Sequence, residues 1–264
     1  MIAFMLRRSE IRLWVSAVSF LMLWSALPAF GTQTDIVVRV LSRDAKFIGS
    51  SMGGAQIIIR DSDTREILAQ GFTVGSTGNT RSVMHKDGGR RARLTDNDAA
   101  LFRTSIDIQR PRRLEVEAIG PTLQGQAANT VTATQWVVPG KHLSGGDGWV
   151  LEMPGFAVDI LAPPAHKRLA GASIEVKIIA NVIMMCGCPI EPGGLWDANR
   201  FEVKALVERD GEDIGEFDLS FAGQTSLFAF DLPLRSAGLY KVTVYAYDPE
   251  NGNTGVDHTS FFAQ

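Results

Sequence analysis

Cysteine is scarce in this sequence, and the two that it has, Cys186 and Cys188, are separated by a single glycine. A small secreted domain that is stapled by disulfides has more cysteines, spread along the chain. A disulfide framework is therefore excluded, and the folded part of the chain must be stabilised by hydrophobic cores.

Several catalytic motifs are missing as well. The sequence contains no Gly-x-Ser-x-Gly elbow, no phosphate-binding loop and no His-Glu-x-x-His pair. Of its four histidines, His85 and His166 fall in polar loops, where a surface position is expected. An excess of positive charge is also missing, since the formal net charge is −3. We therefore expect neither an enzyme nor a nucleic-acid-binding protein.

An apolar run long enough to concern a membrane occurs only near the start of the chain. Basic residues at 7, 8 and 12 precede an apolar stretch over 13–27, and small residues then precede Thr32. This order is typical of a cleaved secretory signal peptide, which we place at residues 1–31. A retained anchor is the alternative, but the run is short for a full span. A bacterial protein that is periplasmic or secreted is expected, with no membrane span in the mature chain.

The mature sequence follows the period of two that is typical of β-strands, and we expect an all-β fold of two β-sandwich domains in tandem. The first domain is placed at 32–152 and the second at 153–264. A glycine-rich stretch, Ser144–Gly148, is the best linker candidate. Strands of the first domain are expected at 36–41, 55–60, 67–71, 102–108, 114–119 and 136–138.

The segment Gly54–Asp61, with Thr64 and Ile67–Thr73, resembles the start of transthyretin-like or carboxypeptidase-regulatory-like domains. The resemblance implies an accessory rather than a catalytic module.

The second domain is expected to form seven strands, at 156–161, 172–184, 201–208, 214–221, 227–232, 239–247 and 255–262. Asp210-Gly211 predicts a hairpin turn. The segment Ala237–Val244 and the turn Asn251–Gly255 resemble bacterial immunoglobulin-like modules. That resemblance implies an immunoglobulin-like β-sandwich with Tyr240 in the place of the corner tyrosine, and it names no ligand.

The segment densest in soft metal ligands is Met184-Met185-Cys186-Gly187-Cys188. Thiolates and thioethers favour Cu(I) over harder ions. In an immunoglobulin-like topology this loop and the start of the last strand share one end of the sandwich, near the point where the chain enters the domain. A soft-metal site of Cys186, Cys188, Met185 and His258 is therefore a hypothesis, with His142 within possible reach.

Simpler interpretations compete with the metal site. Met184 continues the apolar face of its strand and is expected in the core. The two cysteines can instead form a local disulfide across Gly187, or remain buried thiols. Trp196 lies on the loop that follows, either as an exposed anchor for a partner or folded down onto the sandwich end.

Taken together, the sequence predicts an exported, non-enzymatic binding or accessory protein that acts through this end of the second domain, with Cu(I) as the ligand to test first. A metal-free module that binds an envelope protein is the alternative. A thiol-disulfide exchange protein that uses Cys186 and Cys188 is a third.

Overall fold

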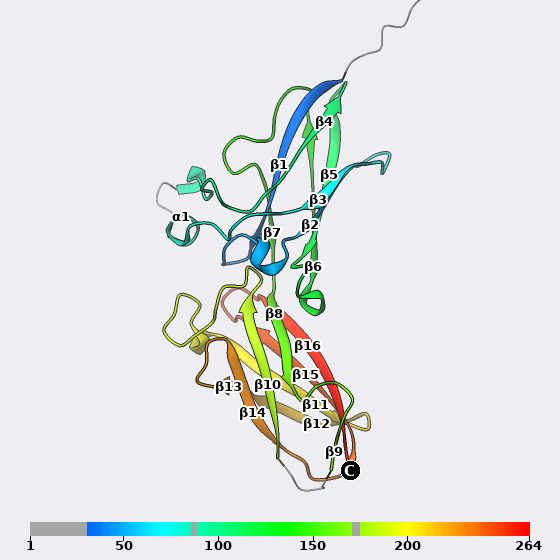
Figure 1. Ribbon diagram of the computed structural model, residues 1–264, viewed down its shortest axis with the longest axis vertical. Helices are drawn as coiled ribbons and strands as arrows, with labels where there is room; N and C mark the ends of the chain where they lie inside the picture. Colours follow the sequence, from blue (N-terminus) through cyan, green and yellow to red (C-terminus); the bar gives the residue numbers. More distant parts are fainter. Residues whose placement is uncertain (1–30, 86–88, 171–174) are drawn as a thin grey trace, which may run out of the picture. The chain divides into compact units, whose positions relative to one another are not determined.

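The computed structural model describes residues 31–85, 89–170 and 175–264. The chain is all-β and forms two β-sandwiches in tandem, which confirms the predicted fold class (Figure 1). The predicted signal peptide, apart from its last residue Gly31, lies outside the described residues. In the described ranges, no helix has the length and apolarity that crossing a bilayer requires.

The first sandwich has a three-stranded sheet in the order β4-β1-β7 and a four-stranded sheet in the order β3-β2-β5-β6. Strand β1 pairs antiparallel with β4 and parallel with β7. Aliphatic side chains from both sheets fill the space between them. The strands are β1 (Thr32–Ser42), β2 (Gln56–Asp61), β3 (Ile67–Phe72), β4 (Phe102–Ile108), β5 (Arg112–Gly120), β6 (Asn129–Val137) and β7 (Trp149–Met153).

Short helical turns accompany these strands. They are η1 (Ser50–Met52), α1 (Thr80–Met84), η2 (Gly89–Arg91) and η3 (Gly125–Ala127). Whether the first sandwich is transthyretin-like stays a prediction.

The second sandwich packs the sheet β13-β14-β10-β8 against the sheet β12-β11-β15-β16-β9. With the strands lettered from β8 as A, the two sheets have the ABED and CFG arrangement of immunoglobulin-like domains, with β12 added beside C. The strands are β8 (Phe156–Ala162), β9 (Lys167–Leu169), β10 (Glu175–Met184), β11 (Glu202–Arg209), β12 (Glu212–Asp218), β13 (Ser220–Phe221), β14 (Leu227–Pro233), β15 (Gly238–Tyr247) and β16 (Thr254–Ala263), and η4 (Ala198–Arg200) precedes β11.

Two local features of the immunoglobulin-like prediction are confirmed. The Tyr240 hydroxyl donates a hydrogen bond to the Ser236 carbonyl oxygen at 2.9 Å, as in a tyrosine corner. Asp210 and Gly211 both have positive φ, 51° and 86°, as the predicted hairpin turn between β11 and β12 requires. The predicted core residue Met184 is buried at the end of β10.

The joint between the sandwiches is shorter than the sequence suggested. Strand β7 ends at Met153 and β8 begins at Phe156, so only Pro154 and Gly155 lie between them. The Asn253 side chain accepts a hydrogen bond from the Gly155 nitrogen and donates one to the Gly155 oxygen. These two bonds fix the backbone of the joint at Gly155.

The predicted linker Ser144–Gly148 is wrong. It is a loop of the first sandwich, where Asp147 accepts hydrogen bonds from the Leu94 and Thr95 backbone nitrogens at 3.0–3.1 Å.

The carboxylates of Asp159 in β8 and Asp257 in β16 make the stability of the second sandwich depend on pH. Partial burial, and then repulsion from Asp257, raise the pKa of Asp159. The Asp257 carboxylate accepts a hydrogen bond from the Ile160 nitrogen at 2.7 Å. We expect Asp159→Asn to raise the free energy of unfolding at pH 7 by less than about 1 kcal/mol, because solvent screens half-exposed charges.

The sign of this effect has a pH signature. A raised pKa means that the wild-type protein gains stability as the pH falls and Asp159 takes up its proton. The advantage of Asp159→Asn should therefore shrink between pH 7 and pH 4, as measured by urea denaturation. A variant less stable than the wild type at pH 7 would contradict the expectation.

Candidate functional site at the junction of the sandwiches

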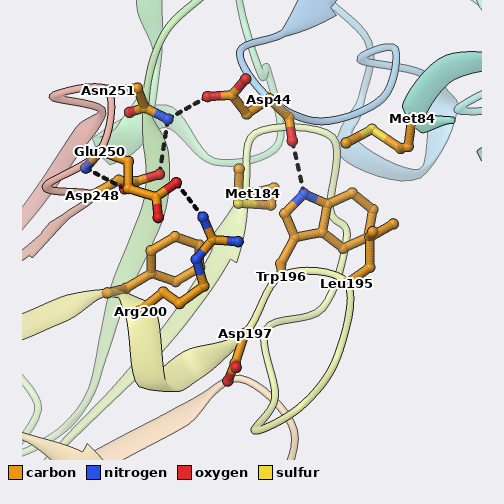
Figure 2. A pocket seen from close by; sticks show the side chains of 11 residues that line it. Asp44, Met84, Met184, Leu195, Trp196, Asp197, Arg200, Asp248, Glu250 and Asn251 are labelled. Atoms are coloured by element: carbon orange, nitrogen blue, oxygen red, sulfur yellow. Dashed lines mark hydrogen bonds and ion pairs between the residues drawn. The ribbon is translucent and has the colours of Figure 1, made fainter. Parts of the chain in front are cut away.

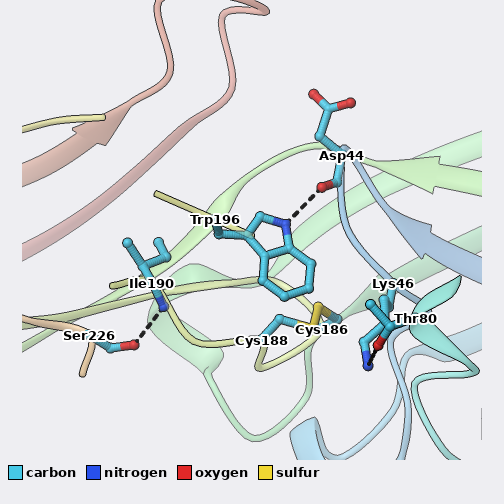
Figure 3. Close-up of a disulfide and its surroundings, with 8 residues drawn as sticks. All are labelled: Asp44, Lys46, Thr80, Cys186, Cys188, Ile190, Trp196 and Ser226. Atoms are coloured by element: carbon cyan, nitrogen blue, oxygen red, sulfur yellow. Dashed lines mark hydrogen bonds between the residues drawn. A yellow bond between two sulfur atoms is a disulfide. The ribbon is translucent and has the colours of Figure 1, made fainter. Parts of the chain in front are cut away.

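The two cysteines form a disulfide at the junction (Figure 3). Their α-carbons are 5.4 Å apart, and Gly187 between them has a φ of +79°, a left-handed conformation that glycine adopts without strain. Both cysteines are buried in the core of the second sandwich. The local disulfide is thus the alternative that the structure adopts.

The side chain of the neighbouring Met185 packs in the first sandwich rather than in the second. Met184 packs in the core of the second sandwich, whereas the fully buried Met185 belongs to the core of the first. A Cβ on Gly187 would lie 2.8 Å from the Met52 sulfur, so η1 of the first sandwich touches this loop directly. The Met-Met-Cys-Gly-Cys segment therefore holds the two sandwiches together.

The predicted copper site is not assembled. The two thiols are joined to each other, and Met185 points into another core. His258 is exposed on the outer face of its sheet, where its Nδ1 atom pairs with the Thr243 hydroxyl at 2.9 Å. His142 accepts from the Asp35 nitrogen within the first sandwich. Met185, His258 and His142 therefore lie in different parts of the two sandwiches, apart from the joined cysteines.

Trp196 takes the second of the two positions that the sequence left open. Its ring is folded down and is 9% exposed, and its indole nitrogen donates to the Asp44 carbonyl oxygen at 2.9 Å. Asp44 lies in the turn after β1, so this hydrogen bond crosses from the second sandwich to the first (Figure 3). Binding of an external partner by Trp196 stays a prediction.

Asp197 stabilises the loop that carries Trp196. Its carboxylate accepts hydrogen bonds from the Asn199 and Gly193 backbone nitrogens, each at 3.0 Å. These two bonds, led by that from Asn199, lower the pKa of Asp197 below its usual value. Asp197 is therefore a fixed negative charge at neutral pH rather than a base.

A cavity of about 450 Å³ opens between the two sandwiches beside Trp196 (Figure 2). The first sandwich contributes the turn after β1 and the end of α1, and the second contributes the loop before β11 and the β15–β16 turn. Its lining combines apolar side chains with charged ones. The lining residues are Asp44, Met84, Met184, Leu195, Trp196, Asp197, Arg200, Phe201, Asp248, Glu250 and Asn251.

Hydrogen bonds fix the charged side of this junction cavity. The Asn251 side-chain nitrogen donates to the carboxylates of Asp44 and Asp248, and Arg200 pairs with Glu250 (Figure 2). The lining therefore has four carboxylates and one guanidinium, a formal charge of −3. Such a cavity attracts a cationic group, and its aromatic walls add to that preference.

Sequence reasoning identified part of this site. It selected Trp196 and expected Met184 in the core beside it, but it did not find Asp44 or Arg200. In the described ranges, no group of three or more His, Cys, Asp or Glu side chains is arranged to hold a metal ion. Nothing in the sequence around Asp44 marks it, because its partners lie far along the chain.

Comparison with known proteins finds solved structures of similar fold, but it does not assign the chain to a family. No family model and no curated protein sequence matches the chain. Among solved structures, the fibronectin(III)-like modules of Clostridium thermocellum CbhA are 13% identical, with 88% of this chain and 94% of theirs covered and a TM-score of 0.29. The truncated tip fimbrial protein Mfa3 of Porphyromonas gingivalis is 10% identical, with 86% and 81% covered and a TM-score of 0.28.

An engineered protein is 19% identical over 48% of this chain, with a TM-score of 0.29, and the match spans only 24% of that protein's length. Superpositions this loose carry no argument about function. The second sandwich nevertheless resembles immunoglobulin-like modules on its own evidence, namely its strand order and its tyrosine corner.

Proposed function

We propose that this chain is an exported binding protein, periplasmic or secreted, which holds a basic group of a protein partner in the junction cavity. The basic group is the ammonium or guanidinium of a lysine or arginine side chain. Export is supported by the charge and apolar pattern of the first residues, and binding by the geometry of the junction.

The observation that carries the proposal is a preformed cavity with a surplus of negative charge between two sandwiches that are fixed to each other. Its volume of about 450 Å³ falls within the range of ligand sites. Asp248 is mostly buried and is fixed by the Glu250 nitrogen and the Asn251 side chain. Because these charges are already oriented, a cation entering the cavity does not have to reorganise them.

Binding fits the junction better than redox or copper chemistry does. Both thiol exchange and Cu(I) binding need an accessible thiolate. Cys186 and Cys188 are joined and are only 1% and 5% exposed. Asp197 is suited to binding rather than proton transfer, since its lowered pKa makes it a poor base.

The proposal can be tested with a small cation. We expect N-acetylarginine amide to shift the NMR signal of the Trp196 indole N–H saturably, whereas the neutral isostere N-acetylcitrulline amide should not. Glu250→Gln should weaken this binding about tenfold, because it removes one carboxylate and leaves Arg200 unpaired in the cavity.

Glu212→Gln is the matched control. Glu212 also pairs with an arginine, Arg209, but it does not line the junction cavity. Its replacement should leave the arginine response unchanged. Equal responses to the charged and neutral probes, or equal effects of the two variants, would refute the proposal.

A further inference from the structure

A second cavity, of about 360 Å³, lies at the other end of the second sandwich. The strand registers place it there: Pro233 at the end of β14 faces the start of β10, whereas Met184 at the junction is the last residue of β10. We call this the distal cavity. Its lining residues are Arg209, Ile214, Phe217, Pro233, Arg235 and Tyr240.

The walls of the distal cavity are apolar rings that other rings hold in place. Phe217 stacks on Phe230 with ring centroids 5.2 Å apart, and Tyr240 stacks on Phe261 at 5.3 Å. The polar atom of Tyr240 is already used in the corner hydrogen bond to Ser236. Tyr240 itself is almost fully buried, so Phe217 and the 38% exposed Ile214 present the preformed surface for an apolar ligand.

The charges that line the distal cavity are both positive. Arg209 has one ionic partner, Glu212, at 3.6 Å, and the Glu212 side chain is 79% exposed, so solvent screens the pair. Arg235 forms no ion pair with any residue of the described ranges. The nearby Asp210 carboxylate is occupied by the Leu239 nitrogen at 2.9 Å. Two guanidiniums at the rim of an apolar cavity are a receptor for an anion.

We propose that the distal cavity binds a small amphipathic carboxylate, whose apolar body lies against Phe217 and Ile214 and whose carboxylate reaches Arg209 and Arg235. The ligand chemistry is a carboxylate on a hydrophobic body. Its source is either a free aromatic acid or the head of an aliphatic acid. This site is independent of the junction cavity, which prefers the opposite charge.

Calorimetric titration of the mature chain with 3-phenylpropionate tests the proposal, and octanoate in a second titration distinguishes an aromatic from an aliphatic body. We expect saturable one-to-one binding of at least one of the acids. The uncharged analogue 3-phenylpropionamide should bind at least tenfold more weakly.

Variants assign the binding to the distal cavity. Arg235→Gln should weaken binding about tenfold, and Glu212→Gln should strengthen it because Arg209 loses its competitor. Arg113→Gln is the control, since this exposed arginine of the first sandwich lines neither cavity, and it should leave the affinity for both acids unchanged. These side chains are largely at the surface, so near-UV circular dichroism should show an unchanged fold.

Three results would overturn the proposal. They are equal binding of the acid and the amide, full affinity in the Arg209→Gln/Arg235→Gln double variant with an unchanged fold, and no saturable binding of either acid.

Discussion

Met185→Ala is expected to lower the free energy of unfolding by about 2–5 kcal/mol, the usual loss for a methionine removed from a well-packed core. The side chain is fully buried, and it belongs to the core of the first sandwich although its backbone belongs to the second. Truncation therefore leaves a cavity at the joint, where Gly155 packs against the Met185 thioether. Urea denaturation of the mature chain measures the loss.

Met184→Ala is the matched control, since it removes the same atoms from the adjacent residue. Met184 is equally buried, but in the core of the second sandwich. Amide hydrogen exchange should separate the two variants. Met185→Ala should accelerate exchange in β1 and β7 of the first sandwich, and Met184→Ala should do so in β8 and β15 of the second.

If exchange in the first sandwich is unaffected by Met185→Ala, the methionine does not link the two cores. A loss below about 1 kcal/mol would lead to the same conclusion, because a buried methionine that can be removed so easily is not part of a packed interface.

The strands were predictable wherever one face is apolar. Alternation over 172–184 predicts a core face of Ile174, Val176, Ile178, Ala180, Val182 and Met184. The five from Val176 onward are buried, and Ile174 lies outside the described residues. Most of β6 was missed, because its outward positions 130, 132 and 134 are threonines and its alternation in hydrophobicity is weak. Pattern reasoning finds strands through the buried side chains and loses those that lie mostly at an exposed edge.

The linker candidate differs from the joint for a related reason, although the boundary predicted between residues 152 and 153 lies beside that joint. Glycine-rich composition marks a turn, but it does not show whether the turn lies within a sandwich or between two. The loop over 144–148 is held to the first sandwich by Asp147, which no composition rule reveals. The joint itself is the dipeptide Pro154-Gly155, which is much shorter than the glycine-rich stretch.

The site was predictable in place but not in chemistry. The sequence drew attention to the segment that begins at the end of β10, because few segments are so rich in sulfur. It could not foresee that Trp196 hydrogen-bonds Asp44, 152 residues away, and so completes a cavity from both sandwiches. Contacts of such long range depend on how the sandwiches pack, which local spacing does not contain.

Replacing both cysteines should destabilise the protein, and the choice of replacement separates two causes. Loss of so short a cross-link costs about 1.5 kcal/mol in chain entropy. Cys186→Ala/Cys188→Ala should show this loss and that of sulfur packing. Cys186→Ser/Cys188→Ser should lose a further ~1–3 kcal/mol for each hydroxyl left without a partner in the core.

Thermal and urea unfolding of the two double variants, compared with the oxidised wild-type protein, measure these terms. Because Cys186 and Cys188 are buried beside Ile190 and Trp196, the serine variant should also lose the Trp196 indole N–H signal of the intact junction. Equal stability of the alanine and serine variants would mean that water reaches the sulfur positions. In that event the burial argument against thiol chemistry fails, and Cu(I) titration of the reduced protein becomes the decisive experiment.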